Sequence, residues 1–262
     1  MAIAAKIRTN IVEMTCIAGS GHPGGSLSAV EILTVLFNKV MRIDPKNPDW
    51  PDRDRFVLSK GHAASALYGT LIERGFFPRE EMQLFRNIGG ILQGHPNMTK
   101  VPGLDISSGS LGQGLSVAVG MALGARLQKK DFRVYALIGC GESQEGQIWE
   151  AGMAAAQFKL DNLTAILDNN GVQLDGNTRD IVDIEPVKDK WQAFRWEVFT
   201  CEGHNVEDLL ENIEKAREVK GKPSIIVAKT TKGKGVSFME DTCAWHGVGD
   251  PGQLNAALEE VK

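Results

Sequence analysis

The sequence predicts a doubly wound α/β fold, in which helices cover both faces of a parallel sheet. Short apolar runs alternate with helical segments from about residue 134 onward, an order typical of β-α-β units. The runs are continuously apolar, as expected for strands that are buried on both faces. A composition of 42% hydrophobic and 24% charged residues is ordinary for a globular protein. No repeat, linker or low-complexity tract divides residues 1–262, so a single domain is predicted.

The N-terminal part of the chain is predicted to be mainly helical. Apolar residues recur on one side of a helix over residues 3–18. Ser26 is the expected N-cap of a second helix that ends near residue 40. Residues 75–109 contain Gly, Pro and His with little periodicity, so we expect a long surface segment there. Segments of that length in a compact protein are usually functional.

The other elements follow from apolar runs and their punctuation by glycine. Further helices are predicted over residues 63–73, 112–129, 145–158, 188–194 and 206–219. The predicted strands are residues 55–58, 134–138, 163–167, 197–201 and 224–229. Ligands of doubly wound folds bind at the carboxyl ends of the strands. The loops after Leu58, Ile138, Leu167 and Lys229 are therefore the expected site.

Composition also excludes several classes of function. The net charge of −4 gives no support for nucleic-acid binding. The longest weakly polar run, residues 116–125, is far shorter than the roughly 20 residues that cross a bilayer. Lys6, Arg8 and Glu13 argue against a signal peptide. The four cysteines form no CxxC pair, so neither a zinc ribbon nor a disulfide framework is indicated. We expect a cytoplasmic protein with no nucleic-acid or membrane partner.

Four of the five histidines lie beside glycine or proline in predicted loops: His22, His62, His95 and His246. Glycine lets the backbone approach a ligand closely, and imidazole exchanges protons near neutral pH. The fifth, His204, is expected to serve a turn. No pair of histidines has the spacing of a HExxH zinc site.

Two polar turns follow neighbouring predicted strands. The segment Gly139-Cys-Gly-Glu142 follows a strand and precedes a helix, where backbone N–H groups and the helix dipole favour an anion such as a diphosphate. It is not a dinucleotide fingerprint, because Gln144 stands where GxGxxG needs glycine. Asp168-Asn-Asn170 begins 27 residues after Gly141. Its side chains either form a turn or ligate a divalent cation, since Mg²⁺ favours a few protein oxygens together with phosphate oxygens.

Taken together, these segments resemble transketolase, a thiamine-diphosphate enzyme. The resemblance is carried by Ser20-Gly-His-Pro-Gly24, Leu58-Ser-Lys-Gly-His62, Gly94-His-Pro96, Ser108-Gly-Ser-Leu-Gly-Gln-Gly114, Gly139-Cys-Gly141, Asn169-Asn170 and Gln144-Glu-Gly-Gln-Ile-Trp-Glu150. It runs in order along nearly the whole chain and matches the N-terminal, diphosphate-binding half of the family. It implies that a partner chain supplies the pyrimidine-binding and C-terminal domains, as in a split transketolase, within a two-plus-two heterotetramer.

The resemblance also implies residue roles. Thiamine diphosphate would be held by His62, Gly109, Ser110, Leu111, Gly139, Gly141, Glu142, Glu145, Asn170 and His246. The reacting sugar would be contacted by His22, His62, His95 and His246. Asn170 and the Val172 carbonyl would ligate Mg²⁺, and Glu145 and Glu150 would connect cofactor sites across the subunit interface. The implied reaction moves a two-carbon ketol unit from a ketose phosphate to an aldose phosphate, and the chain alone is expected to be inactive.

Cys140 departs from the family pattern, which has a magnesium-binding aspartate at this position. A thiol is a poor ligand for a hard cation. We therefore expect metal-dependent cofactor binding to be weakened, unless a softer metal, a partner-supplied ligand or water compensates. Three alternatives remain open. They are a 2-oxoacid dehydrogenase component, a non-catalytic subunit that has lost its metal site, and a dinucleotide oxidoreductase. The loop histidines disfavour a 2-oxoacid dehydrogenase component. Gly141 and Asn170 disfavour a non-catalytic subunit, and the missing GxGxxG disfavours a dinucleotide oxidoreductase.

Overall fold

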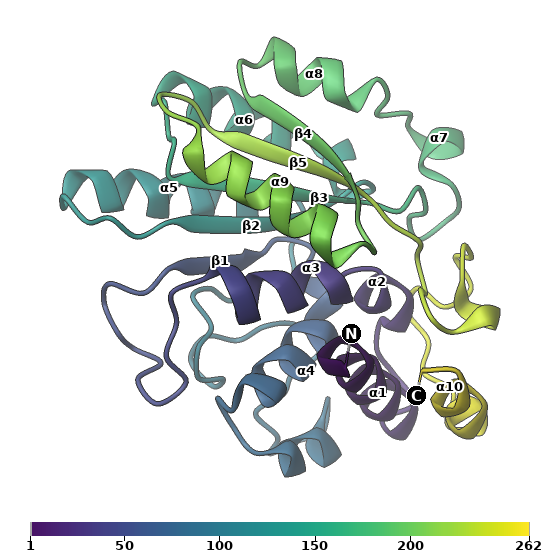
Figure 1. Cartoon of the computed structure of the whole chain (residues 1–262). Helices are drawn as coiled ribbons and strands as arrows, with labels where there is room; N and C mark the ends of the chain where they lie inside the picture. The colour runs from purple at the N-terminus through teal and green to yellow at the C-terminus, as the bar shows by residue number, and fades with distance from the viewer. Residues whose placement is uncertain (1, 262) are drawn as a thin grey trace.

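A five-stranded parallel sheet forms the centre of the computed structural model, which describes residues 2–261 (Figure 1). The strands are β1 (Arg55–Leu58), β2 (Val134–Gly139), β3 (Leu163–Asn169), β4 (Glu197–Glu202) and β5 (Ser224–Lys229). Their order across the sheet is β1-β2-β3-β5-β4, and every neighbouring pair is parallel. The predicted fold class is confirmed.

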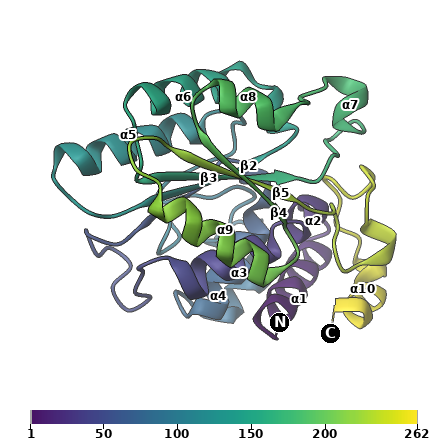
Figure 2. The ribbon, with the colours of Figure 1, turned by 45° about the horizontal axis from the view of Figure 1, so that its top comes forward.

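Helices cover both faces of this sheet (Figure 2). One side carries α1 (Ala2–Ile17), α2 (Pro23–Leu27), α3 (Val30–Val35), α4 (Ala64–Arg74), α9 (Val206–Glu218) and α10 (Leu254–Val261). The other side carries α5 (Gly114–Leu127), α6 (Gly146–Gln157) and α8 (Val187–Ala193), while the short α7 (Thr178–Ile181) lies beyond the end of β3.

The interior strand β2 is apolar throughout because each face of the sheet supports its own core. In β2, Tyr135 and Leu137 belong to the core shared with α1, α3 and α9. Val134, Ala136 and Ile138 belong to the core shared with α5, α6 and α8. All five side chains are fully buried. Successive side chains of a strand point to opposite faces, so a strand covered on both sides needs apolar residues at every position.

Two expectations about local structure were wrong, and two helices were not predicted. Ser26 does not cap a helix: it lies inside α2, which starts at Pro23, and its hydroxyl bonds that of Ser65 at 2.8 Å. The predicted helix 26–40 is divided into α2, α3 and a π-helical turn over Leu36–Val40. α7 and α10 were not predicted, although α10 places its apolar residues at helical spacing against α1.

The parallel register brings the predicted loops to one edge of the sheet. Leu58 pairs with Leu137, Gly139 with Asp168, and Asp168 with Ala228. The residues that follow β1, β2, β3 and β5 therefore meet at the carboxyl edge. Within residues 2–261, no helix combines the length and hydrophobicity that crossing a membrane requires.

Candidate functional site

A pocket of about 220 Å³ lies at this carboxyl edge. Ten of the residues singled out in the sequence line it: His62, Leu111, Gly139, Cys140, Gly141, Glu142, Glu145, Asn170, Val172 and His246. His22, His95, Gly109 and Ser110 lie outside this lining, and Glu150 is exposed on α6. Four larger, more open clefts each contain at most one residue of the predicted set, so the carboxyl-edge pocket is the candidate site.

The four loop histidines converge beside this pocket. The ring centroid of His22 lies 5.5 Å from those of His62 and His246 and 6.0 Å from that of His95. The rings of His62 and His246 are stacked at 5.1 Å. His62 and His246 belong to both the histidine cluster and the pocket wall, so the two features are continuous. Gly109 has φ +153 and packs against the His95 ring, where an added Cβ would lie 3.1 Å from Cγ.

Burial keeps the clustered imidazoles neutral. Burial, together with nearby cations, lowers the pKa of His22 to about 4 and that of His246 to about 3. The pKa of His62 also lies well below its usual value, mainly through burial. Lys232 Nζ lies 2.9 Å from His246 Nδ1. Because an ammonium group only donates, Nδ1 accepts and the His246 proton sits on Nε2. His22 Nδ1 is buried without a hydrogen-bond partner among residues 2–261.

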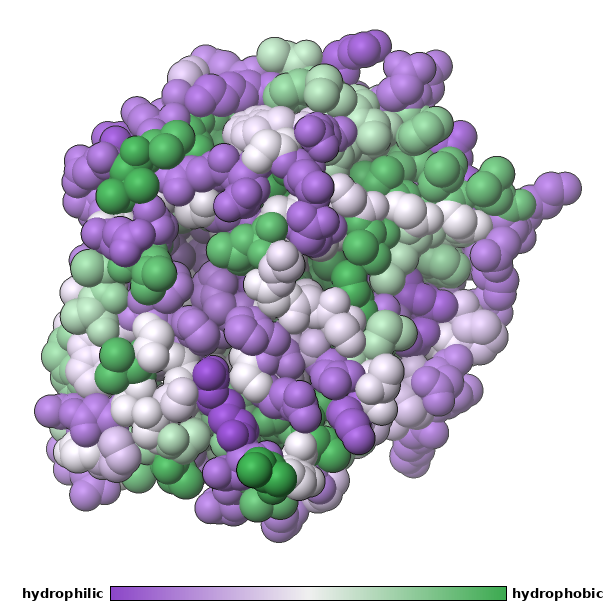
Figure 3. All heavy atoms as spheres, turned by 180° about the vertical axis from the view of Figure 1, so that it is seen from behind, coloured by the Kyte–Doolittle hydropathy of each residue, from purple (hydrophilic) through white to green (hydrophobic). Residues whose placement is uncertain are grey.

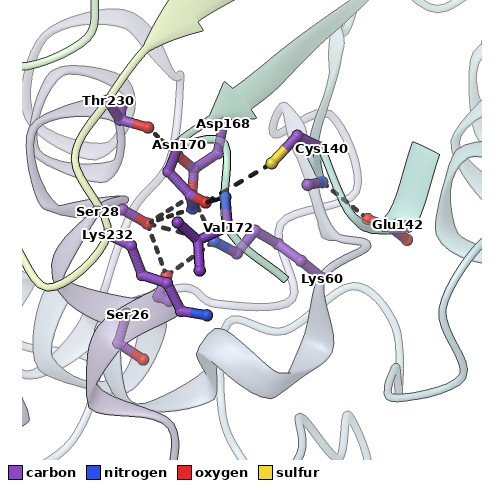
Figure 4. Close-up of polar contacts among 12 residues, drawn as sticks. Ser26, Ser28, Lys60, Cys140, Glu142, Asp168, Asn170, Val172, Thr230 and Lys232 are labelled. Carbon is purple, nitrogen blue, oxygen red and sulfur yellow. Dashed lines mark hydrogen bonds and ion pairs between the residues drawn. The ribbon is translucent and has the colours of Figure 1, made fainter. Parts of the chain in front are cut away.

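A buried ion pair that the sequence reasoning missed lies under the pocket (Figure 4). Lys60 Nζ donates to Asp168 Oδ2 and to the Gly25 carbonyl at 2.8 Å. Asp168 also accepts hydrogen bonds from Ser28 Oγ at 2.6 Å and from Thr230 Oγ1. Burial raises the pKa of Asp168, but the charge and hydrogen bonds of Lys60 outweigh it and keep the carboxylate ionised. The pair ties the ends of β1, β3 and β5 together.

Both missed residues stood inside segments that had been singled out. Lys60 is the middle residue of Leu58-Ser-Lys-Gly-His62, and Asp168 opens Asp168-Asn-Asn170. Lys232, also missed, follows the end of β5 and donates to the Gln173 carbonyl at 3.0 Å as well as to His246. Burial lowers the pKa of Lys232 to about 8, which leaves it largely protonated at neutral pH.

Glu142 lies in the pocket wall, but its carboxylate is already hydrogen-bonded to other groups of the chain. It accepts hydrogen bonds from Ser59 Oγ and from the backbone N–H groups of Gly112 and Gly139, the latter two at 3.0 Å. Burial raises its pKa. Glu142 thus braces the loops after β1 and β2 against the turn before α5.

The candidate metal ligands lie together on the pocket wall. Cys140 Sγ donates to Asn170 Oδ1 at 3.6 Å, and the Val172 backbone N–H donates to the same oxygen at 3.1 Å. Burial raises the pKa of Cys140, so the sulfur is a neutral thiol at pH 7. The amide and carbonyl oxygens suit a hard cation, whereas the thiol does not. Within residues 2–261, no group of three or more His, Cys, Asp or Glu side chains is placed to hold a metal ion.

The pocket fits thiamine diphosphate. The Lys232 ammonium adjoins one end of the pocket through its contacts with Gln173 and His246, and Leu111 and Leu174 give an apolar wall elsewhere. An added Cβ at Gly141 would lie 2.7 Å from Gln173 Cβ, so any side chain there would fill the turn. An ammonium group beside a glycine turn is suited to a phosphate group, and the apolar wall to an aromatic ring.

This fold and site define a class of protein, one that holds an anionic cofactor at the carboxyl ends of parallel strands. Residues 1–255 match the family model described as "Transketolase, thiamine diphosphate binding domain". The chain therefore belongs to the transketolase family, within its thiamine-diphosphate-binding domain. The predicted family and cofactor are confirmed, whereas Mg²⁺ and the roles of individual residues stay predictions.

The relatives include separate subunits as well as long single chains. The chain is 44% identical to an apulose-4-phosphate transketolase subunit of Phocaeicola vulgatus, covering 98% of this chain and 91% of the relative. It is 48% identical to a 6-deoxy-6-sulfo-D-fructose transketolase subunit of Clostridium sp., and the match covers 87% of this chain and 83% of the relative. The crystal structure of transketolase from Campylobacter jejuni matches all of this chain with a TM-score of 0.93 and 34% identity. The chain spans 43% of that protein.

Proposed function

We propose that this chain is the thiamine-diphosphate-binding subunit of a two-chain transketolase. It moves a two-carbon ketol unit from a ketose phosphate to an aldose phosphate and needs its partner chain for activity. The observation that carries this proposal is the continuity of four neutral imidazoles with the carboxyl-edge pocket, because His62 and His246 belong to both. A sugar with several hydroxyl groups needs many donors and acceptors, and a neutral imidazole offers one of each.

The cofactor supplies, when bound, a thiazolium ring that stabilises the negative charge left by carbon–carbon cleavage. This chain's residues bind and orient. Gly141, Asn170 and Lys232 hold the diphosphate end, and the backbone at Gly109 and the side chain of Leu111 hold the rings.

The histidines divide the proton chemistry. His22 has an unpartnered Nδ1 and is neutral at pH 7, so it accepts the proton of the sugar C3 hydroxyl as a general base. His246 carries its proton on Nε2 because Lys232 occupies Nδ1, so it donates a hydrogen bond to the sugar. His95, at the outer side of the cluster, contacts the C1 hydroxyl.

The Asn170 side chain and the Val172 carbonyl would hold a divalent cation, which would offset the negative charge of the diphosphate. Without a carboxylate at position 140, Mg²⁺ binds more weakly than the family pattern allows. A related loss in the outer ligand shell costs about 10- to 100-fold in metal affinity.

The partner chain docks on the side of the molecule formed by α5 and α6. Figure 3 shows the molecule from behind, and hydrophobic residues gather in the upper right of this view, where α5 runs. Exposed hydrophobic residues of this part of the chain are Leu111, just before α5, Val117 and Leu127 on α5, and Met153 on α6. Leu111 also lines the pocket, so a partner seated on this face closes the cofactor site. We propose a two-plus-two assembly, with Glu145 and Glu150 facing the interface. The four free cysteines suit a reducing cytoplasm.

Ketol transfer by the reconstituted enzyme tests this proposal. The chain and a companion carrying the rest of a transketolase are purified separately and assayed alone and mixed, with thiamine diphosphate and Mg²⁺. The proposal expects transfer from a ketose phosphate to an aldose phosphate in the mixture only. Efficient transfer by this chain alone contradicts the need for a partner. Turnover of pyruvate in place of the ketose phosphate points to a 2-oxoacid enzyme instead.

A further inference from the structure

We infer that Glu31 and His204 are positioning residues that hold Lys232, and through it His246, in the geometry of the site. Both lie outside the pocket, on α3 and in the turn between β4 and α9. The inference rests on the proposed function only for its cofactor measurement, because the positioning of His246 can be observed directly.

His204 contacts the segment after β5 through a ring whose tautomer is fixed. Its Nε2 accepts a hydrogen bond from the Thr231 backbone N–H at 2.8 Å, and its Nδ1 lies 2.8 Å from Glu31 Oε2. Since Nε2 must accept, the ring proton sits on Nδ1 and is donated to Glu31. The sequence suggested only that His204 serves a turn, but the structure gives it these two further contacts. His204 connects α3 to the residue next to Lys232.

Arg8 on α1 completes the arrangement from the other side. Its guanidinium donates to Glu31 Oε1 at 2.5 Å and to the Lys234 carbonyl at 3.1 Å. Gly235 permits this approach, because an added Cβ there would lie 2.9 Å from Arg8 Nε. One carboxylate thus fixes the two side chains that hold Thr231 and Lys234. Lys232 lies between these two anchored residues.

The Glu31 carboxylate is suited to this task because it is almost completely enclosed, with 6% exposure. Burial raises its pKa, but the hydrogen bonds and charges of His204 and Arg8 outweigh this and keep it ionised. A buried carboxylate with two charged or polar partners has one favoured geometry, and removing one partner is costly. The segment carrying Lys232 is consequently fixed in register with α1 and α3.

Lys232 transmits this placement to the pocket. Its ammonium donates to His246 Nδ1 and to the Gln173 carbonyl, both of which line the pocket. A shift of the segment that carries Lys232 disturbs the contact to His246, and within residues 2–261 the ammonium is the one hydrogen-bond partner of that ring. His246 then loses the partner that keeps its proton on Nε2.

Glutamine and asparagine at position 204 separate the two contacts. In His204→Gln the side-chain oxygen reaches the position of Nε2 and keeps the bond to Thr231. In His204→Asn the amide reaches only the position of Nδ1, so the bond to Glu31 stays and that to Thr231 is lost. Glu31→Gln weakens both the contact to His204 and the contact to Arg8. Asp54→Asn is the matched control. Asp54 is a buried carboxylate that binds the backbone N–H groups of Arg42 and Arg133 at the opposite edge of the sheet.

The experiment is nitrogen-15 NMR of the imidazoles in the full chain. His246 is identified by comparison with a His246→Gln sample. We expect a single Nε2–H tautomer in the parent chain, His204→Gln and Asp54→Asn, and a mixture of tautomers in His204→Asn, Glu31→Gln and Lys232→Met. Thiamine diphosphate binding is measured by calorimetry. Its affinity should weaken about 3- to 10-fold in His204→Asn and in Glu31→Gln, as expected for loss of one hydrogen bond.

Two results decide against the inference. An unchanged His246 signal in both His204→Asn and Glu31→Gln overturns it, whatever the cofactor affinity. An equal change in Asp54→Asn overturns it as well, because the effect would then reflect general loosening of the fold. If the His246 signal changes as expected while neither the parent chain nor any variant binds thiamine diphosphate in the presence of the companion chain, the positioning stands and the proposed cofactor role fails.

Discussion

Restoring a carboxylate at position 140 tests the metal site most sharply. In Cys140→Asp the new oxygens face Asn170 Oδ1, which lies 3.6 Å from the present sulfur and already accepts a bond from Val172. Without metal, oxygen faces oxygen in a position that is 1% exposed, and the buried Asp168 adds a second negative charge. Leaving a buried acceptor unsatisfied costs about 1–3 kcal/mol. In a chain of this length, that lowers the Tm of the metal-free chain by about 2–10 °C.

With Mg²⁺ and thiamine diphosphate present, Cys140→Asp should have a higher Tm than the parent chain, because the carboxylate becomes a metal ligand. A gain of about 10- to 100-fold in Mg²⁺ affinity is expected, the range known for outer-shell ligands. The assay is differential scanning fluorimetry of both chains over a Mg²⁺ series at fixed cofactor, with metal-free samples as references. Cys140→Asn, which adds no charge, is the matched control. Equal Mg²⁺ dependence of Cys140→Asp and the parent chain refutes the reasoning.

Three further predictions concern the frame of the site. Glu142→Gln replaces an acceptor of three hydrogen bonds and should lower the free energy of unfolding by about 1–3 kcal/mol in urea titrations; an unchanged midpoint contradicts the bracing role. Gly61→Ala places a Cβ 2.6 Å from the Gly109 nitrogen, and overpacking of this kind costs about 1–3 kcal/mol; thiamine diphosphate binding should weaken, and equal affinity argues against close packing there. Folded His22 has a pKa of about 4 against an ordinary 6.5, so the folded chain binds fewer protons. The free energy of unfolding therefore falls from pH 6.5 toward 4, and His22→Gln should flatten that fall; an identical pH profile contradicts the assignment.

The fold was predictable because its strands carry an unambiguous pattern. The strands β1, β2, β3 and β5 have continuous apolar runs, and glycine follows the run of β2 and Asp-Asn that of β3. The helix that continues from Ser26 was not predictable in detail. Gly24 and Gly25 lie inside α2, where Gly24 approaches Lys232 and Gly25 approaches His62. These approaches depend on loops more than 30 residues away and leave no local pattern.

The site was predictable in its loops and only partly in its chemistry. The histidines could be found from their glycine neighbours. The ion pair of Lys60 and Asp168 could not, because its partners are 108 residues apart and meet only through the order of the strands. The link from His204 to Thr231 has the same origin, since strand β5 lies between β3 and β4. A charged residue in a loop gives no sign of which distant residue it pairs with.

The central claim is that this chain forms the cofactor-binding half of a two-chain transketolase. Native mass spectrometry of the complex recovered from its own cells tests this claim most directly, with thiamine diphosphate and metal measured on the same sample. The account predicts an assembly in which each 28.5 kDa chain is joined by one companion chain, with thiamine diphosphate and a divalent ion present. A lone 28.5 kDa chain, or a complex free of cofactor, would contradict it.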